Sequence, residues 1–205
     1  MQIRLTMFLS LALLYLLHDR IMSSRFKRRY GKAENFLGKN APNEIQRFFG
    51  RAVYLTMIYY LLVFIYLITG FTFWGLISTI TLLDGIVFQL LGFSLGLLFL
   101  LLMTKARFNL GSSWRIGLDR NTADYLVTTG FYRYVRNPYF FFLMGFQFSL
   151  ILVVPNAVML FSFIQSLLLF NLQVREEEQF LFEKYGDDYS TYQKDTGRFF
   201  PRLRF

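Results

Sequence analysis

An uncharged stretch of 36 residues, from Tyr139 to Val174, constrains the fold more than any other feature of the sequence. It is broken once, by Pro155 and Asn156. Because ~20 predominantly apolar residues cross the hydrocarbon core of a bilayer as a helix, the stretch is long enough to cross twice, with a turn at the proline. Hydrophobic residues make up 55% of the chain and aromatic residues 20%, well above the balance of an ordinary soluble domain. The sequence therefore predicts an integral membrane protein.

Three further apolar runs precede this hairpin. We predict an all-α polytopic membrane bundle formed by a single domain, residues 1–205, with about five transmembrane helices over residues 2–17, 50–70, 85–105, 138–154 and 156–174. The first run could instead be a cleaved signal peptide, although no small-residue cleavage pattern follows it. In the third run, Gly92 and Gly96 form a GxxxG pattern, for which packing inside the monomer is favoured over dimerisation.

The basic residues follow the expected topology, which explains the formal net charge of +9 without a nucleic-acid partner. They gather in residues 19–51, 105–138 and 174–205, whereas the connections at residues 70–84 and 155–156 contain no Lys or Arg. Since Lys and Arg are enriched in cytoplasmic loops, the N-terminus is expected outside and the C-terminus in the cytoplasm. Anionic headgroups are expected to contact the cluster Arg25, Lys27, Arg28 and Arg29.

The residue inventory narrows the possible chemistry. The chain has no cysteine, which excludes disulfides and thiol nucleophiles, and no metal site is predicted. Its only histidine, His18, is remote in sequence from the segments that look functional, so an imidazole base is not expected. An acceptor that is already ionised, such as a carboxylate, would require no base.

The polar segment between Lys105 and Pro138 ends in a helix start. Asn137 is a typical capping residue and Pro138 a typical first helical residue, and a helix N-terminus in a basic setting favours an anionic group. The final segment is expected to continue the last span as a helix that ends at Gly186. The remainder is expected to fold back over the same end of the bundle.

Three sequence features of this region occur in a fixed order. The first is Leu126-Val127-Thr128-Thr129-Gly130-Phe131-Tyr132, and the second is Arg136-Asn137-Pro138-Tyr139. The third is Glu177-Glu178 before Gly186, followed by Tyr189, Tyr192 and Arg198-Phe199-Phe200-Pro201. Together they resemble the isoprenylcysteine carboxyl methyltransferase family in its wider sense, which includes prokaryotic relatives and the membrane phospholipid methyltransferases. The resemblance covers residues 105–201.

The resemblance implies an enzyme of a prokaryotic cytoplasmic membrane that binds S-adenosylmethionine on its cytoplasmic side and methylates a lipophilic or lipid-linked acceptor. The implied donor contacts are Asp124, Tyr125, Leu126, Val127, Tyr132, Asn137, Pro138, Tyr139, Phe140 and Glu177. Arg136 and Glu177 are the candidate catalytic residues. Gln173 and Arg175 are the candidate substrate contacts.

The chemistry of these residue types fits that donor. Glu177 can accept hydrogen bonds from its amine or ribose, and the helix start near Arg136 and Asn137 can hold its carboxylate. Tyr132 or Tyr139 can stack on the base or face the sulfonium. Alternatively, the glutamates form a solvated helix face, and the tyrosines and Arg136 are interfacial residues.

Three positions depart from the family's eukaryotic pattern: Asn137 replaces a histidine, Phe140 a tyrosine, and Gln173 an arginine. A prenylcysteine substrate is therefore not implied. Carboxyl O-methylation is slightly preferred over N-methylation of a phospholipid. A nicotinamide-dependent membrane reductase and a non-catalytic lipid-binding protein are also compatible with the sequence.

Overall fold

The computed structural model describes residues 1–31, 44–115 and 125–202. Its α-helices are α1 (Gln2–Tyr30), α2 (Glu44–Thr69), α3 (Ile86–Leu110), α4 (Pro138–Val153), α5 (Ala157–Tyr185) and α6 (Asp187–Asp195). Short 3-10 turns are η2 (Thr81–Leu83), η3 (Gly111–Ser113) and η4 (Gly130–Arg133). Across these described ranges there is no strand beyond two isolated bridges, so the predicted all-α fold is confirmed.

Four of these helices, α1, α2, α3 and α5, are long and apolar enough to cross a bilayer, and α4 is a shorter apolar helix. The prediction of a helical membrane bundle is therefore confirmed. The helices contain the apolar runs seen in the sequence, and most extend beyond them. The largest extension is in α1, which continues from Leu17 to Tyr30 through charged residues, because a helix need not end where the hydrocarbon ends.

The short helix α4 has a structural consequence at its C-terminal end. Its 16 residues rise only ~24 Å, less than the ~30 Å of a hydrocarbon core. The turn that follows is covered by the connection between α2 and α3: the Ile80 amide donates to the Pro155 carbonyl at 2.8 Å, and the Ala157 amide donates to the Ser78 carbonyl at 3.0 Å. Asn156 at this turn is 1% exposed. The backbone groups on either side of Asn156 are therefore hydrogen-bonded within the protein, as surroundings without water require.

The GxxxG pattern packs α3 against α4 and α1. A Cβ at Gly92 would lie 2.6 Å from the Ser149 carbonyl oxygen, and one at Gly96 would lie 2.8 Å from a Leu11 methyl group. Lipid supplies no hydrophobic drive between helices, so such close van der Waals contact is a main source of bundle stability. Both glycines serve packing within this chain.

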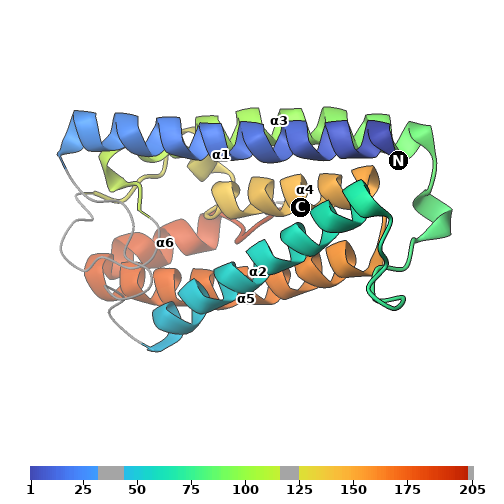
Figure 1. Ribbon diagram of the computed structural model, residues 1–205. Coiled ribbons are helices and arrows are strands. Elements are labelled where there is room, and N and C mark those ends of the chain that lie inside the picture. The colour runs from blue at the N-terminus through green and yellow to red at the C-terminus, as the bar shows by residue number, and fades with distance from the viewer. Residues whose placement is uncertain (32–43, 116–124, 203–205) are drawn as a thin grey trace.

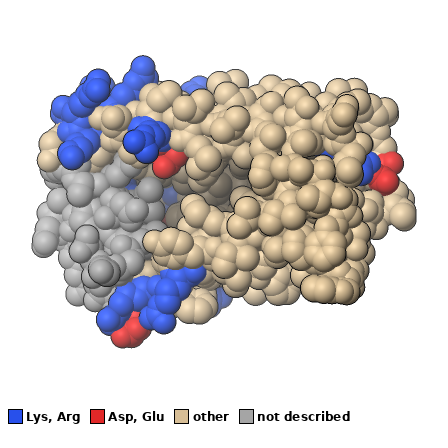
Figure 2. Space-filling model, viewed as in Figure 1, with Lys and Arg blue, Asp and Glu red and all other residues tan. Residues whose placement is uncertain are grey.

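The arrangement places charge at one end of the bundle (Figure 1, Figure 2). α1 and α3 lie side by side above α4, and α2 and α5 lie below it. Lys and Arg gather over the C-terminal end of α1 and the N-terminal end of α2, whereas the middle of this face is almost free of charged residues. We call the end of the bundle where these Lys and Arg residues gather the basic end. At the opposite end, Arg4 pairs with Asp84.

Candidate active site

The start of α4 lies at the basic end, where the C-terminal segment (residues 187–202) folds back on it. The Arg136 amide donates to the Gly197 carbonyl at 2.9 Å, and the Asn137 amide donates to the Arg198 carbonyl at 3.1 Å. The Tyr192 hydroxyl donates to the Tyr132 carbonyl at 2.6 Å. Burial raises the pKa of the Tyr192 hydroxyl, which stays protonated and able to donate. This return of the chain agrees with the expectation from the sequence.

Asn137 occupies the capping position of α4 and Pro138 is the first helical residue, as predicted. The Asn137 side chain, however, makes no capping hydrogen bond. Its amide nitrogen instead donates to Glu178 Oε1 at 3.4 Å and to the Arg198 carbonyl at 3.3 Å. Glu178 on α5 and the Arg198 carbonyl in the C-terminal segment are thus its partners in place of a backbone amide in the first turn of α4.

Glu178 is the centre of a buried ion-pair cluster. Its side chain is 7% exposed and accepts from Arg136 Nε at 2.9 Å and from Arg198 Nη2 at 2.7 Å. The Arg136 guanidinium also donates to the Gln193 carbonyl at 3.1 Å and to the Thr196 carbonyl. Arg136 thus joins the start of α4 to α5 and to the C-terminal segment. It borders the cavity described next, but its hydrogen bonds are those of a positioning residue.

Glu177, one residue earlier, faces a different environment. Its carboxylate accepts from Gln173 Nε2 at 2.8 Å, and Gln173 accepts from Gln46 Nε2 on α2 at 2.7 Å. No ion pair to Glu177 occurs within the described residues. Glu177 lies beyond the apolar run of α5, and burial raises the pKa of its carboxyl, opposed by Gln173 and by the charge of Arg115. Such a carboxylate is suited to receive a cation.

Glu177 lines a cavity of about 770 Å³ that reaches from the basic end into the apolar part of the bundle. Small-molecule sites are typically ~300–1,000 Å³, so the size fits a ligand. Of the residues predicted for the site, the structure places ten in this lining: Tyr125, Leu126, Val127, Tyr132, Arg136, Asn137, Tyr139, Phe140, Gln173 and Glu177. Residues far apart in the sequence are therefore brought together.

Two described residues among those predicted for the site are not part of that lining. Pro138 is buried at the start of α4 without bordering the cavity. Arg175 is exposed on α5 and also lies outside the lining, because it is rotated about 200° round the helix from Gln173. Asp124 lies outside the described residues.

Four aromatic residues, Trp114, Tyr132, Tyr139 and Tyr189, line the polar end of the cavity. Trp114 and Tyr139 meet edge to face with ring centroids 4.5 Å apart. Tyr132 is buried, and burial raises the pKa of its hydroxyl well above the ordinary value. The Tyr189 hydroxyl is buried with no hydrogen-bond partner in the described part of the chain, although Tyr189 borders the cavity. A polar ligand group would satisfy it.

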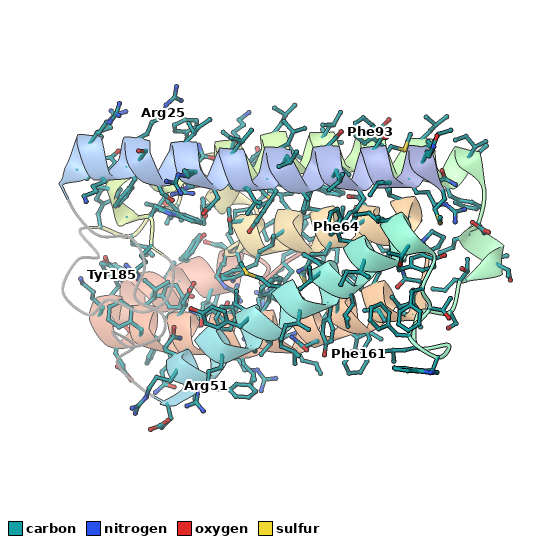
Figure 3. The ribbon with its side chains drawn as sticks, in the orientation of Figure 1. Arg25, Arg51, Phe64, Phe93, Phe161 and Tyr185 are labelled. Atoms are coloured by element: carbon teal, nitrogen blue, oxygen red, sulfur yellow. The ribbon has the colours of Figure 1, made fainter. Side chains whose placement is uncertain are left out.

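The other side of the cavity comes from α1 and α2, which the sequence motifs did not include. Asp19 borders the polar end, and Arg107 Nη1 donates to it at 3.4 Å. Further along, the walls are apolar and include Phe8, Ala12 and Phe64. Phe64 lies on α2 in the middle of the bundle, and the surface is hollowed between α1 and α2 (Figure 3, Figure 2). No sequence motif marks these residues, because their place in the cavity wall depends on how α1 and α2 pack.

The fold and this cavity define an integral membrane protein with a ligand site that joins a polar end to an apolar interior. The phospholipid methyltransferase family matches residues 87–188, about half of the chain. No curated protein matches the sequence. The chain belongs to the membrane methyltransferase group that includes the phospholipid methyltransferases, as the sequence motifs indicated.

Proposed function

We propose that the protein transfers a methyl group from S-adenosylmethionine to the amine headgroup of a phospholipid that enters the cavity from the bilayer. One observation carries the donor assignment: Glu177 is a half-buried carboxylate with no ion-pair partner among the described residues, in a cavity with aromatic walls. A carboxylate drawn partly out of water is destabilised, and a cationic ligand would offset that cost. S-adenosylmethionine supplies a methyl group on a sulfonium cation.

The residues of the chain have distinct roles in this proposal. Glu177, oriented by Gln173 and Gln46, attracts the cationic donor. Tyr139 and Trp114 offer ring faces and edges to it. The apolar walls exclude water from the nucleophile, and methyl transfer depends mainly on alignment and desolvation of this kind.

Asp19 favours an amine over a carboxylate acceptor. The amine nitrogen uses its lone pair to form a bond to the methyl carbon as the carbon–sulfur bond breaks. The electron pair of the broken carbon–sulfur bond stays on sulfur. An ammonium headgroup must also lose one proton for each methyl group added, and Asp19 provides an acidic side chain on the α1 wall to attract the ammonium and take that proton. A carboxylate headgroup carries no proton to lose and would gain no attraction from Asp19.

The donor assignment is tested by binding of labelled S-adenosylmethionine to the detergent-purified protein. Glu177→Gln is expected to weaken binding at least tenfold, about 1.4 kcal/mol or more. Glu176→Gln is the matched control, since Glu176 is on the same turn but does not line the cavity. Equal binding by wild type and E177Q would overturn the assignment. Stabilisation by a nicotinamide cofactor alone would favour a reductase.

The acceptor is tested by incubation with methyl-labelled donor and a membrane lipid extract. Treatment with base releases volatile methanol from a methyl ester but leaves an N-methyl group on the headgroup, so non-volatile label is expected after the treatment. Base-labile label would identify carboxyl O-methylation instead. Saturable donor binding without any labelled product would identify a non-catalytic protein.

The route from the bilayer has its own test. Ala12→Phe adds bulk to the α1 wall and is expected to lower transfer severalfold while donor binding is retained. Leu14→Phe is the matched control, because Leu14 is 42% exposed on the same helix and does not border the cavity. Equal transfer by both variants would contradict a route between α1 and α2.

A further inference from the structure

A second pocket lies at the basic end, between the C-terminal turns of α1 and α3. Its volume is about 520 Å³. The residues of the described chain that line it are Met22, Arg25, Phe26, Arg28, Arg29, Tyr30, Arg107, Phe108, Gly111 and Trp114. Among these described residues there are four arginines and no acidic side chain. We call it the basic pocket.

The arginines are arranged around an apolar floor. Met22 and Phe26 are buried, while Arg25 and Arg29 follow them on the same side of α1 at helical spacing. Arg29 Cζ lies 5.7 Å from the Tyr30 ring centroid, and Arg107 Cζ lies 4.7 Å from the Trp114 ring centroid. A ligand in this pocket would meet guanidinium groups at its rim and hydrocarbon beneath them.

The pocket lies beyond the apolar part of α1. The predicted span of α1 ends at Leu17, and charged residues follow from Asp19 onward. Arg25 and Arg29 lie about two to three turns beyond that span, at the basic end of the bundle. Arg25 is labelled on this part of α1 in Figure 3, and the basic surface around it is visible in Figure 2.

We propose that the basic pocket binds the phosphate of an anionic membrane lipid, separately from the methyl-transfer cavity. The planar guanidinium groups of Arg25, Arg28 and Arg29 form bidentate hydrogen bonds to phosphate oxygens, and Met22 and Phe26 contact the first carbons of the lipid. The proposal is independent of the methyl donor and of the acceptor.

A simpler role for these arginines is to offset helix dipoles. Two helix C-termini meet here, at Tyr30 and Leu110, and each carries partial negative charge that basic residues in the last turn neutralise. If the arginines only offset the helix dipoles, lipid binding should not depend on Arg25 and Arg29 more than on other basic residues of α1. Variants that remove the same charge inside and outside the pocket therefore distinguish the two roles.

The test is native mass spectrometry of the detergent-purified full chain titrated with phosphatidylglycerol, with phosphatidylcholine, or with inorganic phosphate. The pocket variant is R25Q/R29Q. The matched control is R20Q/K27Q, which removes the same charge from exposed positions of the same helix that do not line the pocket. All four side chains are exposed, so both variants are expected to fold.

We expect retention of phosphatidylglycerol by the wild type and the control, and retention weakened on the order of tenfold in R25Q/R29Q. Equal loss in the control would show general surface electrostatics and overturn the proposal. Equal retention of phosphatidylcholine would overturn it as well. Saturation by inorganic phosphate that displaces the lipid would assign the pocket to a soluble phosphate ligand and overturn the membrane source.

Trp114 gives a second readout, because it lines both the basic pocket and the larger cavity. The chain has 2 tryptophans, and Trp74 is 93% exposed at the opposite end. In a Trp74→Phe background, phosphatidylglycerol added without methyl donor is expected to change the emission of Trp114, and R25Q/R29Q is expected to abolish that change. An unchanged response in the pocket variant would contradict the proposal.

Discussion

Glu177 and Glu178 are chemically identical neighbours, yet the structure predicts that neutralising Glu178 destabilises the fold whereas neutralising Glu177 changes its stability little. Glu178→Gln removes the charge that accepts from Arg136 and Arg198. Breaking a buried ion pair costs ~3–5 kcal/mol when one partner is lost. Arg198 is 37% exposed, so water can take over part of its solvation, and we expect the lower end of that range, about 3 kcal/mol.

Thermal unfolding in detergent measures this effect. A chain of this size shifts by ~2–4 °C per kcal/mol, so E178Q is expected to melt ~6–12 °C below the wild type. Glu177→Gln is the control: the amide keeps an oxygen for the hydrogen bond from Gln173, and the cost of a partly desolvated charge disappears. Its melting temperature should stay within about 2–4 °C of the wild type, corresponding to less than ~1 kcal/mol. Equal melting temperatures for E178Q and the wild type, or a larger loss in E177Q, would refute the assigned roles.

Three further predictions concern packing, one hydrogen bond and pH. Gly92→Ala should cost ~1–3 kcal/mol because its methyl group would clash with a carbonyl of α4, whereas Gly85→Ala, whose nearest neighbour would be 3.8 Å away, should cost less, since it loses only the N-cap preference for Gly over Ala. Tyr192→Phe should lose ~1 kcal/mol, measured by unfolding, because the carbonyl of Tyr132 loses its donor. Since the pKa of Glu177 is raised in the folded chain, the native state keeps a proton that the unfolded chain has lost. Stability should therefore fall as the pH rises from the ordinary glutamate pKa through the raised one, and E177Q should flatten that dependence.

The helical bundle was predictable because its determinants are local. An apolar run of sufficient length specifies a helix in lipid, and Pro155 with Asn156 specifies the turn between α4 and α5. Asn156 caps α5 by accepting from the Met159 amide at 2.9 Å. Gly186, with a φ of 52°, ends α5 where the sequence placed its end. Each of these features depends on residues within a few positions of one another.

The opposite wall of the site was not predictable, because it depends on contacts between distant helices. Asp19 and Gln46 belong to no motif. The packing of α1 brings Asp19 to the cavity wall, and the packing of α2 brings Gln46 to Gln173. Asn137 lies in the capping position as predicted, but the partner of its side chain was not predictable for the same reason. The side chain donates to Glu178, 41 residues away in the sequence, and makes no capping hydrogen bond.

The division of labour between the two glutamates follows from helix geometry. Successive residues are rotated by ~100° round a helix, so the side chain that reaches Arg136 and Arg198 cannot also face the cavity. Glu178 fixes the C-terminal segment and the start of α4, and those two elements carry Tyr189 and Tyr139 to the cavity wall. Glu177 is then left with a carboxylate that only an amide satisfies among the described residues. Loss of Glu178 should consequently weaken donor binding through altered geometry, and that loss should be recovered in part at low temperature, where the segment stays docked. Loss of Glu177 should weaken donor binding at every temperature.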